Sequence, residues 1–193
     1  RPPGHHAHRD KGHGFCLFNS IGVAAEYLAR GYKHNRVLIV DIDIHFGDGT
    51  YEIVSTSDVK DKLHYFSINQ EGLFPFHGKG CIEPPEEDDV STNIFLPYGT
   101  TDEKYRRIFD RGFDKAVKTF KPNIIAVSAG FDTCVYDREM YGEIMGLGFS
   151  LTWATYRHIK KSLDKLGKPY FCVLEGGYNP ESIEVGLRAF LEK

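Results

Sequence analysis

The apolar residues of the chain form short continuous runs that alternate with segments of helical spacing. The runs are rich in β-branched residues and hardly alternate with polar ones. They occupy residues 36–42, 64–68, 93–96, 123–128 and 169–174. Runs of this kind are typical of parallel strands that are buried on both faces of a sheet. The pattern therefore predicts the strands of a mostly parallel sheet.

Four helices are predicted between and after these strands. Asn19 and Asn179 are expected N-caps, and Gly31 and Gly167 are expected stops. The expected apolar faces are Val23 and Tyr27 with Ala24 and Leu28 beside them; Tyr105, Phe109, Phe113, Val117 and Phe120; Trp153, Tyr156, Ile159, Leu163 and Leu166; and Ile183, Leu187 and Leu191. Strands that alternate with helices predict a three-layer α/β/α fold with a mostly parallel sheet.

Length and organisation indicate a single domain over residues 1–193. A chain of 193 residues, 41% of them hydrophobic, can bury one substantial core, and it contains no internal repeat or linker. The chain opens on Arg1-Pro2-Pro3-Gly4 without a methionine. We therefore expect a domain that lacks an N-terminal and a C-terminal portion.

Charge and cysteine usage argue against several classes of protein. Lys and Arg number 24 against 27 Asp and Glu, without the basic cluster that direct nucleic-acid binding needs. No apolar run approaches the ~20 residues that span a bilayer, and no signal-peptide pattern opens the chain. The cysteines Cys16, Cys81, Cys134 and Cys172 lack CxxC spacing, as free thiols in a reducing compartment do. We expect a soluble, cytoplasmic protein without a membrane partner.

Acidic residues and a histidine follow directly after predicted strands, where the ligands of parallel sheets gather. Asp43 and His45 lie two residues apart, so in an extended backbone their side chains share a face. Asp132, from another strand end, can supply a third ligand. One histidine and two carboxylates leave positions open for water, which is typical of a catalytic metal site. Taken alone, the pair Asp43 and His45 also fits a strand-end cap beside a loop histidine.

A histidine pair and a tyrosine supply candidates for acid–base chemistry. Either His5 or His6 could take a proton from water, and Asp41 and Asp48 could each orient one ring through its other nitrogen. Taken without their neighbours, His5 and His6 could also be two surface histidines or part of a purification tag. Tyr178 follows two glycines and could donate to a carbonyl oxygen as charge develops there, although a core tyrosine at a strand end fits the same residues.

The chain contains, in this order, RPPGHHA (1–7), GFCLFN (14–19), VDIDIHFGDGT (40–50), LFPFHGKG (73–80), SAGFD (128–132) and LEGGYN (174–179). Together these segments resemble the histone deacetylase superfamily in order and spacing, over nearly the whole chain. The first and last are more similar to class II histone deacetylases and acetylpolyamine amidohydrolases than to class I enzymes. The resemblance implies the arginase/deacetylase fold, with the active site at the C-terminal ends of the strands.

The resemblance implies a zinc-dependent deacetylase that hydrolyses the amide of acetyl-lysine or of an acetylated polyamine by metal-activated water. Asp43, His45 and Asp132 would ligate the zinc, and ferrous iron is the alternative metal for such ligands. The implied catalytic residues are His5, His6, Asp41, Asp48 and Tyr178. His6 would be the general base oriented by Asp48, His5 would pair with Asp41, and Tyr178 would polarise the scissile carbonyl.

A substrate tunnel and a second ion also follow from the resemblance. Phe15 and Phe74 would form the tunnel walls, with Gly14 and Gly177 beside them. A structural potassium site, built largely from backbone oxygens, maps to Asp41, Asp43, His45, Ser67 and Ile68.

One residue departs from the family pattern. Phe46 stands where many members have a second histidine, but that position is not a ligand. An arginase-like enzyme with two manganese ions would need further bridging carboxylates, and near Asp132 the chain offers Asp137 and Glu139. A non-catalytic module that binds acyl-lysine or acts as a scaffold is the other alternative. The sequence does not decide the substrate or the oligomeric state.

Overall fold

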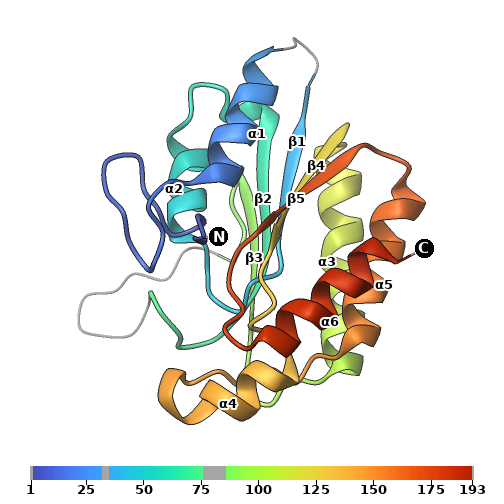
Figure 1. The fold of residues 1–193 in the computed structure, drawn as a ribbon. Coiled ribbons are helices and arrows are strands. Elements are labelled where there is room, and N and C mark those ends of the chain that lie inside the picture. The colour runs from blue at the N-terminus through green and yellow to red at the C-terminus, as the bar shows by residue number, and fades with distance from the viewer. Residues whose placement is uncertain (1, 32–34, 76–85, 193) are drawn as a thin grey trace.

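A five-stranded parallel sheet forms the centre of the computed structural model, which describes residues 2–31, 35–75 and 86–192 (Figure 1). The strands are β1 (Val37–Asp41), β2 (Leu63–Gln70), β3 (Ser91–Leu96), β4 (Ile124–Ala129) and β5 (Tyr170–Leu174). Their order across the sheet is β3-β2-β1-β4-β5, and every neighbouring pair is parallel. The predicted parallel strands are therefore confirmed.

Helices cover both faces of this sheet. They are α1 (Ser20–Gly31), α2 (Asp48–Thr56), α3 (Asp102–Phe120), α4 (Val135–Met145), α5 (Trp153–Leu166) and α6 (Pro180–Leu191), with a short 3₁₀ helix η1 (Lys60–Lys62). Helices α1 and α2 lie on one face, α3, α5 and α6 lie on the other, and α4 lies at the edge where the strands end (Figure 1). This arrangement confirms the three-layer α/β/α fold.

Two apolar cores separate the layers. Leu38 and Val40 of β1 point into the core beneath α3, α5 and α6, while Val37 and Ile39 point into the core beneath α1 and α2. All five residues of β1 are buried, as expected of a central strand with helices on both sides. None of the helices in the described residues has the length and apolar character needed to cross a membrane.

The predicted apolar faces of two helices were wrong. In α1, Val23 and Tyr27 are exposed, whereas Ile21, Ala25 and Ala29 are buried against the sheet. In α6 the exposed residues include Leu187 and Leu191, and the buried ones are Ser182, Gly186 and Ala189. Small side chains let a helix approach its neighbours closely, so the tightly packed face is not the one with the largest apolar residues. Helices α2 and α4 were not predicted.

Parallel pairing brings the strand ends to one edge of the sheet. Asp41, the last residue of β1, is paired in register with Ser67 of β2 and with Ser128 of β4. Glu175, directly after β5, donates its backbone N–H to the carbonyl of Ala129 at the end of β4. The segments that follow β1, β4 and β5 therefore meet at this edge.

His64 of β2 lies far from that edge, in a buried position at the opposite end of the strand. Its Nε2 is 3.1 Å from Oγ1 of Thr92, and its ring packs on Phe120 with a centroid separation of 5.4 Å. Burial lowers the pKa of His64 to about 4, although Asp88 and Glu87 act in the opposite direction. The folded protein therefore holds this imidazole neutral.

We expect His64 to make folding stability fall as the pH drops from about 6.5 to about 4, since the unfolded chain takes up this proton first. The advantage of the wild type over His64→Asn in free energy of unfolding should shrink across this window by about 2–3 kcal/mol. Urea titrations of both proteins at a series of pH values measure this difference. If the free energies of unfolding of the two proteins changed with pH in the same way, His64 would be ruled out as the titrating group.

Candidate functional site

Three buried ligand atoms converge where β1 and β4 end. Nδ1 of His45 lies 3.0 Å from Oδ1 of Asp43 and 3.0 Å from Oδ2 of Asp132. In the described residues, these three side chains form the group of potential ligands whose donor atoms lie within 4.8 Å of one another. The structure thus brings together the three residues predicted as metal ligands.

The electrostatics of this triad suit a cation. Burial and the neighbouring Asp43 raise the pKa of Asp132 to about 7. Burial would lower the pKa of His45, but hydrogen bonds to Asp132 and Asp43 raise it to about 9. Two carboxylates that share one buried place favour any positive charge between them. One imidazole nitrogen and two carboxylate oxygens also form the donor set of an open divalent metal site, so the residues fit zinc or ferrous iron.

Two glycines leave the space that the side chains of the triad occupy. A side chain at Gly176 would collide with the carboxylates of Asp43 and Asp132, and one at Gly130 would collide with Asp43. Gly176 also donates its backbone N–H to Oδ2 of Asp43 at 2.8 Å. The glycine that follows β5 therefore holds a ligand directly, a role that sequence reasoning did not assign to it.

Each histidine of the predicted pair lies beside a different aspartate. Nδ1 of His5 is 3.0 Å from Oδ2 of Asp41, and Nδ1 of His6 is 2.7 Å from Oδ1 of Asp48. The ring centroids of the two histidines are 4.0 Å apart. The two imidazole–carboxylate pairs expected from the sequence are both present in the structure.

The two imidazoles differ in electrostatic environment. Burial would lower the pKa of His5, but the carboxylates of Asp43 and Asp41 raise it well above its usual value. The pKa of His6 is lowered to about 3 by burial and by the charge of His5, against the opposing effect of Asp48. Neighbouring groups whose pKa values are driven apart can divide acid and base roles between them.

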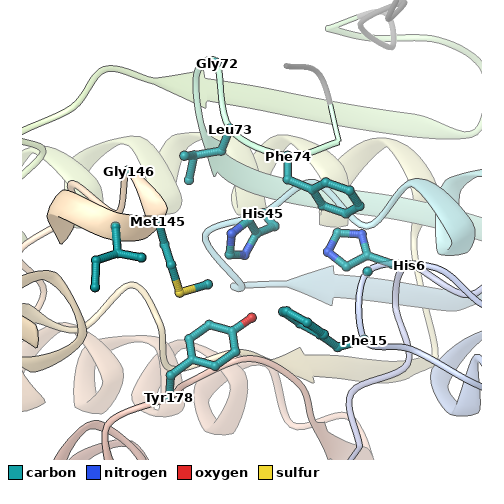
Figure 2. A pocket seen from close by; sticks show the side chains of 11 residues that line it. His6, Phe15, His45, Gly72, Leu73, Phe74, Met145, Gly146 and Tyr178 are labelled. Atoms are coloured by element: carbon teal, nitrogen blue, oxygen red, sulfur yellow. The ribbon is translucent and has the colours of Figure 1, made fainter. Parts of the chain in front are cut away.

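Tyr178 is held at the edge of the site through its backbone. Its N–H donates to Oδ1 of Asp137 at 2.8 Å, and the N–H of Asn179 donates to the same oxygen at 3.3 Å. The tyrosine hydroxyl points into the cavity beside His45 (Figure 2). Asp137 was considered from the sequence only as a further metal-bridging carboxylate. Its role in the structure is to orient the backbone that carries the tyrosine.

A cavity of about 650 Å³ opens over the triad (Figure 2). The predicted tunnel residues Phe15, Phe74 and Gly14 line it together with His6, His45 and Tyr178, and Leu73, Ile144 and Met145 add apolar surface that sequence reasoning missed. Phe74 packs edge-on against His6 at a centroid separation of 4.8 Å. Gly177 is not among the lining residues and instead takes a φ of 120° in the turn before Tyr178.

Glu175 is a further functional candidate that sequence reasoning missed. It is fully buried, and its Oε2 accepts the backbone N–H groups of Gly4 at 2.6 Å and of His5 at 3.0 Å. This carboxylate ties the segment that carries the histidines to the end of β5. The segment LEGGYN (174–179) includes Glu175, but only the folded chain shows which groups its carboxylate binds.

Asn69 binds several of the residues to which the resemblance maps a potassium site. Its side-chain amide donates to the carbonyl oxygens of Asp43 at 3.2 Å and of His45 at 2.9 Å. Ser67 donates its hydroxyl to Oδ1 of Asn69 at 2.8 Å. A carbonyl oxygen has two lone pairs, so these hydrogen bonds leave one on each oxygen. The implied potassium site stays a prediction.

Phe46 also has a structural role. It is buried among Tyr51, Tyr65 and Phe95, with ring centroids 5.7–6.1 Å away. The aromatic residue that replaces a histidine thus completes the core beneath α2.

Comparison with known proteins identifies what the chain is similar to. The family model of the histone deacetylase domain matches residues 1–193. "Histone deacetylase 14, chloroplastic" of Arabidopsis thaliana is 35% identical over 95% of this chain and 42% of its own length. "Polyamine deacetylase HDAC10" of Danio rerio is also 35% identical over 95% of the chain, and over 27% of its own length.

The chain is also similar to a solved structure. An acetylpolyamine aminohydrolase from Burkholderia pseudomallei superimposes with a TM-score of 0.80 at 28% identity, over 98% of this chain and 53% of that one. The chain therefore spans about half or less of the length of these relatives.

Loss of one carboxylate should empty the metal site. We expect Asp132→Asn to abolish stoichiometric zinc binding, because the remaining Asp43 and His45 offer too few ligands to retain the ion. Zinc content after dialysis, measured by mass spectrometry of the metal, tests this. Asp137→Asn is the matched control, since it alters a buried aspartate outside the triad and should keep the ion. Full zinc occupancy in Asp132→Asn would refute its role as a ligand.

A second prediction concerns Asn69. Its side-chain amide donates to the carbonyl oxygens of Asp43 and His45. Asn69→Ala leaves both carbonyls without this donor, which should lower the free energy of unfolding by about 1–3 kcal/mol. Urea titrations of the two proteins measure the difference.

Asn19→Ala is the control for this experiment, because it removes another buried amide that donates to a carbonyl, that of Ala7. It should lower the free energy of unfolding by a similar amount. An unchanged free energy of unfolding in Asn69→Ala would contradict the structural role of its amide.

Proposed function

Because the chain belongs to the histone deacetylase family, we propose that it carries the active site of a zinc-dependent deacetylase that hydrolyses the amide of an acetylated amine. The observation that carries the proposal is the juxtaposition at one strand edge of a buried Asp43–His45–Asp132 triad, a histidine that lines the cavity and a tyrosine that points into it. Metal ligands, a base and an oxyanion donor around one cavity are the components of metal-assisted hydrolysis.

Asp43, His45 and Asp132 would hold the metal. A zinc ion in such an open site acts as a Lewis acid on a carbonyl oxygen and lowers the pKa of a bound water from 15.7 toward ~7. The protein's contribution is a dry and rigid setting, since all three ligands are buried.

His6 is proposed as the general base and acid. Its Nδ1 proton is directed to Asp48, so the lone pair of Nε2 is available to the cavity that His6 lines. With its pKa lowered to about 3, the ring is neutral before reaction and can accept a proton from the attacking water. The same nitrogen can then return the proton to the departing amine, which is a poor leaving group without it.

His5 is proposed as the electrostatic partner of this base. It is buried between Asp41 and Asp43, with Nε2 3.8 Å from Oδ2 of Asp43. Because these carboxylates raise its pKa well above the usual value, it stays positively charged while His6 exchanges protons. A fixed positive charge 4.0 Å from His6, measured between ring centroids, favours the return of the proton from His6 to the amine.

Tyr178 is proposed as the donor to the developing oxyanion. Its hydroxyl points into the cavity, and its backbone is held by Asp137. Hydrogen-bond donors that are already in place cost no reorganisation when charge develops on the carbonyl oxygen, which is why such groups contribute strongly to catalysis.

The cavity suits an extended aliphatic arm. Phe15 and Phe74 flank its entrance, while Leu73 and Met145 supply apolar surface farther round the wall (Figure 2). Acetyl-lysine presents four methylene groups to such a wall. The arm of an acetylated polyamine is also aliphatic, so both amines stay candidate substrates.

Turnover on a substrate panel tests the proposal. The zinc-loaded protein should release acetate from acetyl-lysine peptides or from acetylated spermidine, and the panel identifies the preferred amine. Tyr178→Phe should lower kcat by roughly 10²–10³, because one oxyanion donor is lost while the ligands stay in place.

Tyr141→Phe is the matched control for the tyrosine variant, since it removes a hydroxyl from a ring whose centroid is 6.1 Å from that of Tyr178. It should retain activity. An unchanged kcat in Tyr178→Phe would remove this tyrosine from the mechanism. Inactivity of the metal-loaded protein on every acetylated amine would instead favour the non-catalytic acyl-lysine-binding module.

A further inference from the structure

A second imidazole extends the His6–Asp48 pair away from the cavity. Oδ1 of Asp48 faces Nδ1 of His6 at 2.7 Å, and Oδ2 faces Nε2 of His8 at 2.9 Å. Nδ1 of His8 in turn lies 2.9 Å from Oε2 of Glu52. Imidazole and carboxylate groups therefore alternate in one unbroken chain of hydrogen bonds from the cavity wall toward the surface.

The geometry of α2 accounts for this chain. Asp48 is the first residue of the helix, and Glu52 lies four residues later on the same face. His8 bridges the two carboxylates. Side-chain exposure rises along the chain from 5% at His6 to 17% at Asp48 and His8 and 35% at Glu52. The outer members thus lie between the buried base and solvent.

The ring of His8 is held from both sides by carboxylates of α2. Its Nε2 faces Oδ2 of Asp48 and its Nδ1 faces Oε2 of Glu52, each at 2.9 Å. Burial acts to raise the pKa of Asp48, but hydrogen bonds from His6 and His8 lower it, which keeps this carboxylate ionised.

Few other groups face this chain in the described residues. Nε2 of His13 is 3.8 Å from Oδ2 of Asp48, beyond hydrogen-bonding distance. The backbone N–H of Arg9 donates to Oε2 of Glu52 at 3.2 Å, while its guanidinium contacts Glu26. His8 is therefore the group that holds the outer oxygen of Asp48.

We propose that His8 is a positioning residue for the hydrolysis assigned above, on which this inference rests. By fixing Oδ2 of Asp48, His8 sets the plane of the carboxylate so that Oδ1 receives the Nδ1 proton of His6 and Nε2 of His6 faces the cavity. His8 is not among the residues that line the cavity, so it would not contact an amine bound there. Loss of His8 should therefore lower kcat and leave KM unchanged.

Kinetics of matched variants test the proposal. His8→Gln removes the ring that bridges Asp48 and Glu52, and we expect kcat to fall about tenfold, as for other groups that orient a site residue from outside. His8→Lys supplies an ammonium group that can donate to both carboxylates and should restore most of this loss. His158→Gln is the control, since it breaks an exposed imidazole–carboxylate pair with Asp110 elsewhere on the surface. It should leave kcat unchanged.

A spectroscopic readout makes the test independent of turnover. In the zinc-loaded wild type, long-range ¹H–¹⁵N spectra of the histidine rings should show His6 with its proton on Nδ1. His8→Gln should populate the other tautomer of His6, and His8→Lys should return the signal to Nδ1.

Each outcome decides the proposal. A wild-type kcat and an unchanged His6 signal in His8→Gln would overturn it, as would an effect on KM or on thermal stability alone. If the wild type deacetylates no substrate, the proposed function fails and the ring spectra decide the role of His8 separately. A tautomer shift in His8→Gln would then still support positioning.

Discussion

Several carboxylates are buried together at one edge of the sheet, and the structure around them is organised to supply their hydrogen-bond donors. An unpaired charge in such a place is strongly destabilising. Asp43 receives the backbone N–H groups of His45 and Gly176, and Asp132 receives that of Ile44. Glu175 receives those of Gly4 and His5. The same contacts join the ends of β1, β4 and β5 to the segment that carries the histidines.

This concentration of negative charge explains why two adjacent histidines behave differently. His5 lies between carboxylates and is held positive, whereas His6 lies between that charge and a single aspartate and is held neutral. Adjacent residues of the chain thus supply a fixed charge and a proton acceptor, because the ring of His5 reaches the end of β1 and that of His6 reaches the first residue of α2. Structural stability and acid–base polarity therefore have the same origin in this protein.

The apolar wall of the cavity comes from segments outside the sheet. Phe15 has a φ of 65° and is largely exposed, an uncommon conformation for a bulky residue. Met145 lies at the end of α4, beyond the sheet edge, with Gly146 directly after it. Asp43, His45 and Asp132, by contrast, follow closely after β1 and β4. The apolar wall and the potential ligand triad thus come from separate elements.

The sequence by itself determined the features that depend on local periodicity and on chain direction. Continuous apolar runs identify buried parallel strands, and parallel strands end at one edge, so Asp43, His45 and Asp132 could be grouped before any coordinates were known. The residues also indicated that Asp41 and Asp48 could each orient one histidine of the pair, since an imidazole near a metal needs an acceptor. Which aspartate pairs with which histidine came from the resemblance to the family.

Only the tertiary structure decided which surfaces and side chains meet across layers. The buried face of α1 depends on how closely the helix approaches the sheet, so Ala25 is buried while the larger Tyr27 is exposed. Glu175, Asp137 and Asn69 form hydrogen bonds with backbone groups far away in the chain. The type of a residue does not predict such a distant partner. Hydrophobic periodicity reports the surroundings of a segment, whereas these contacts depend on the relative placement of segments, which exists only in the folded chain.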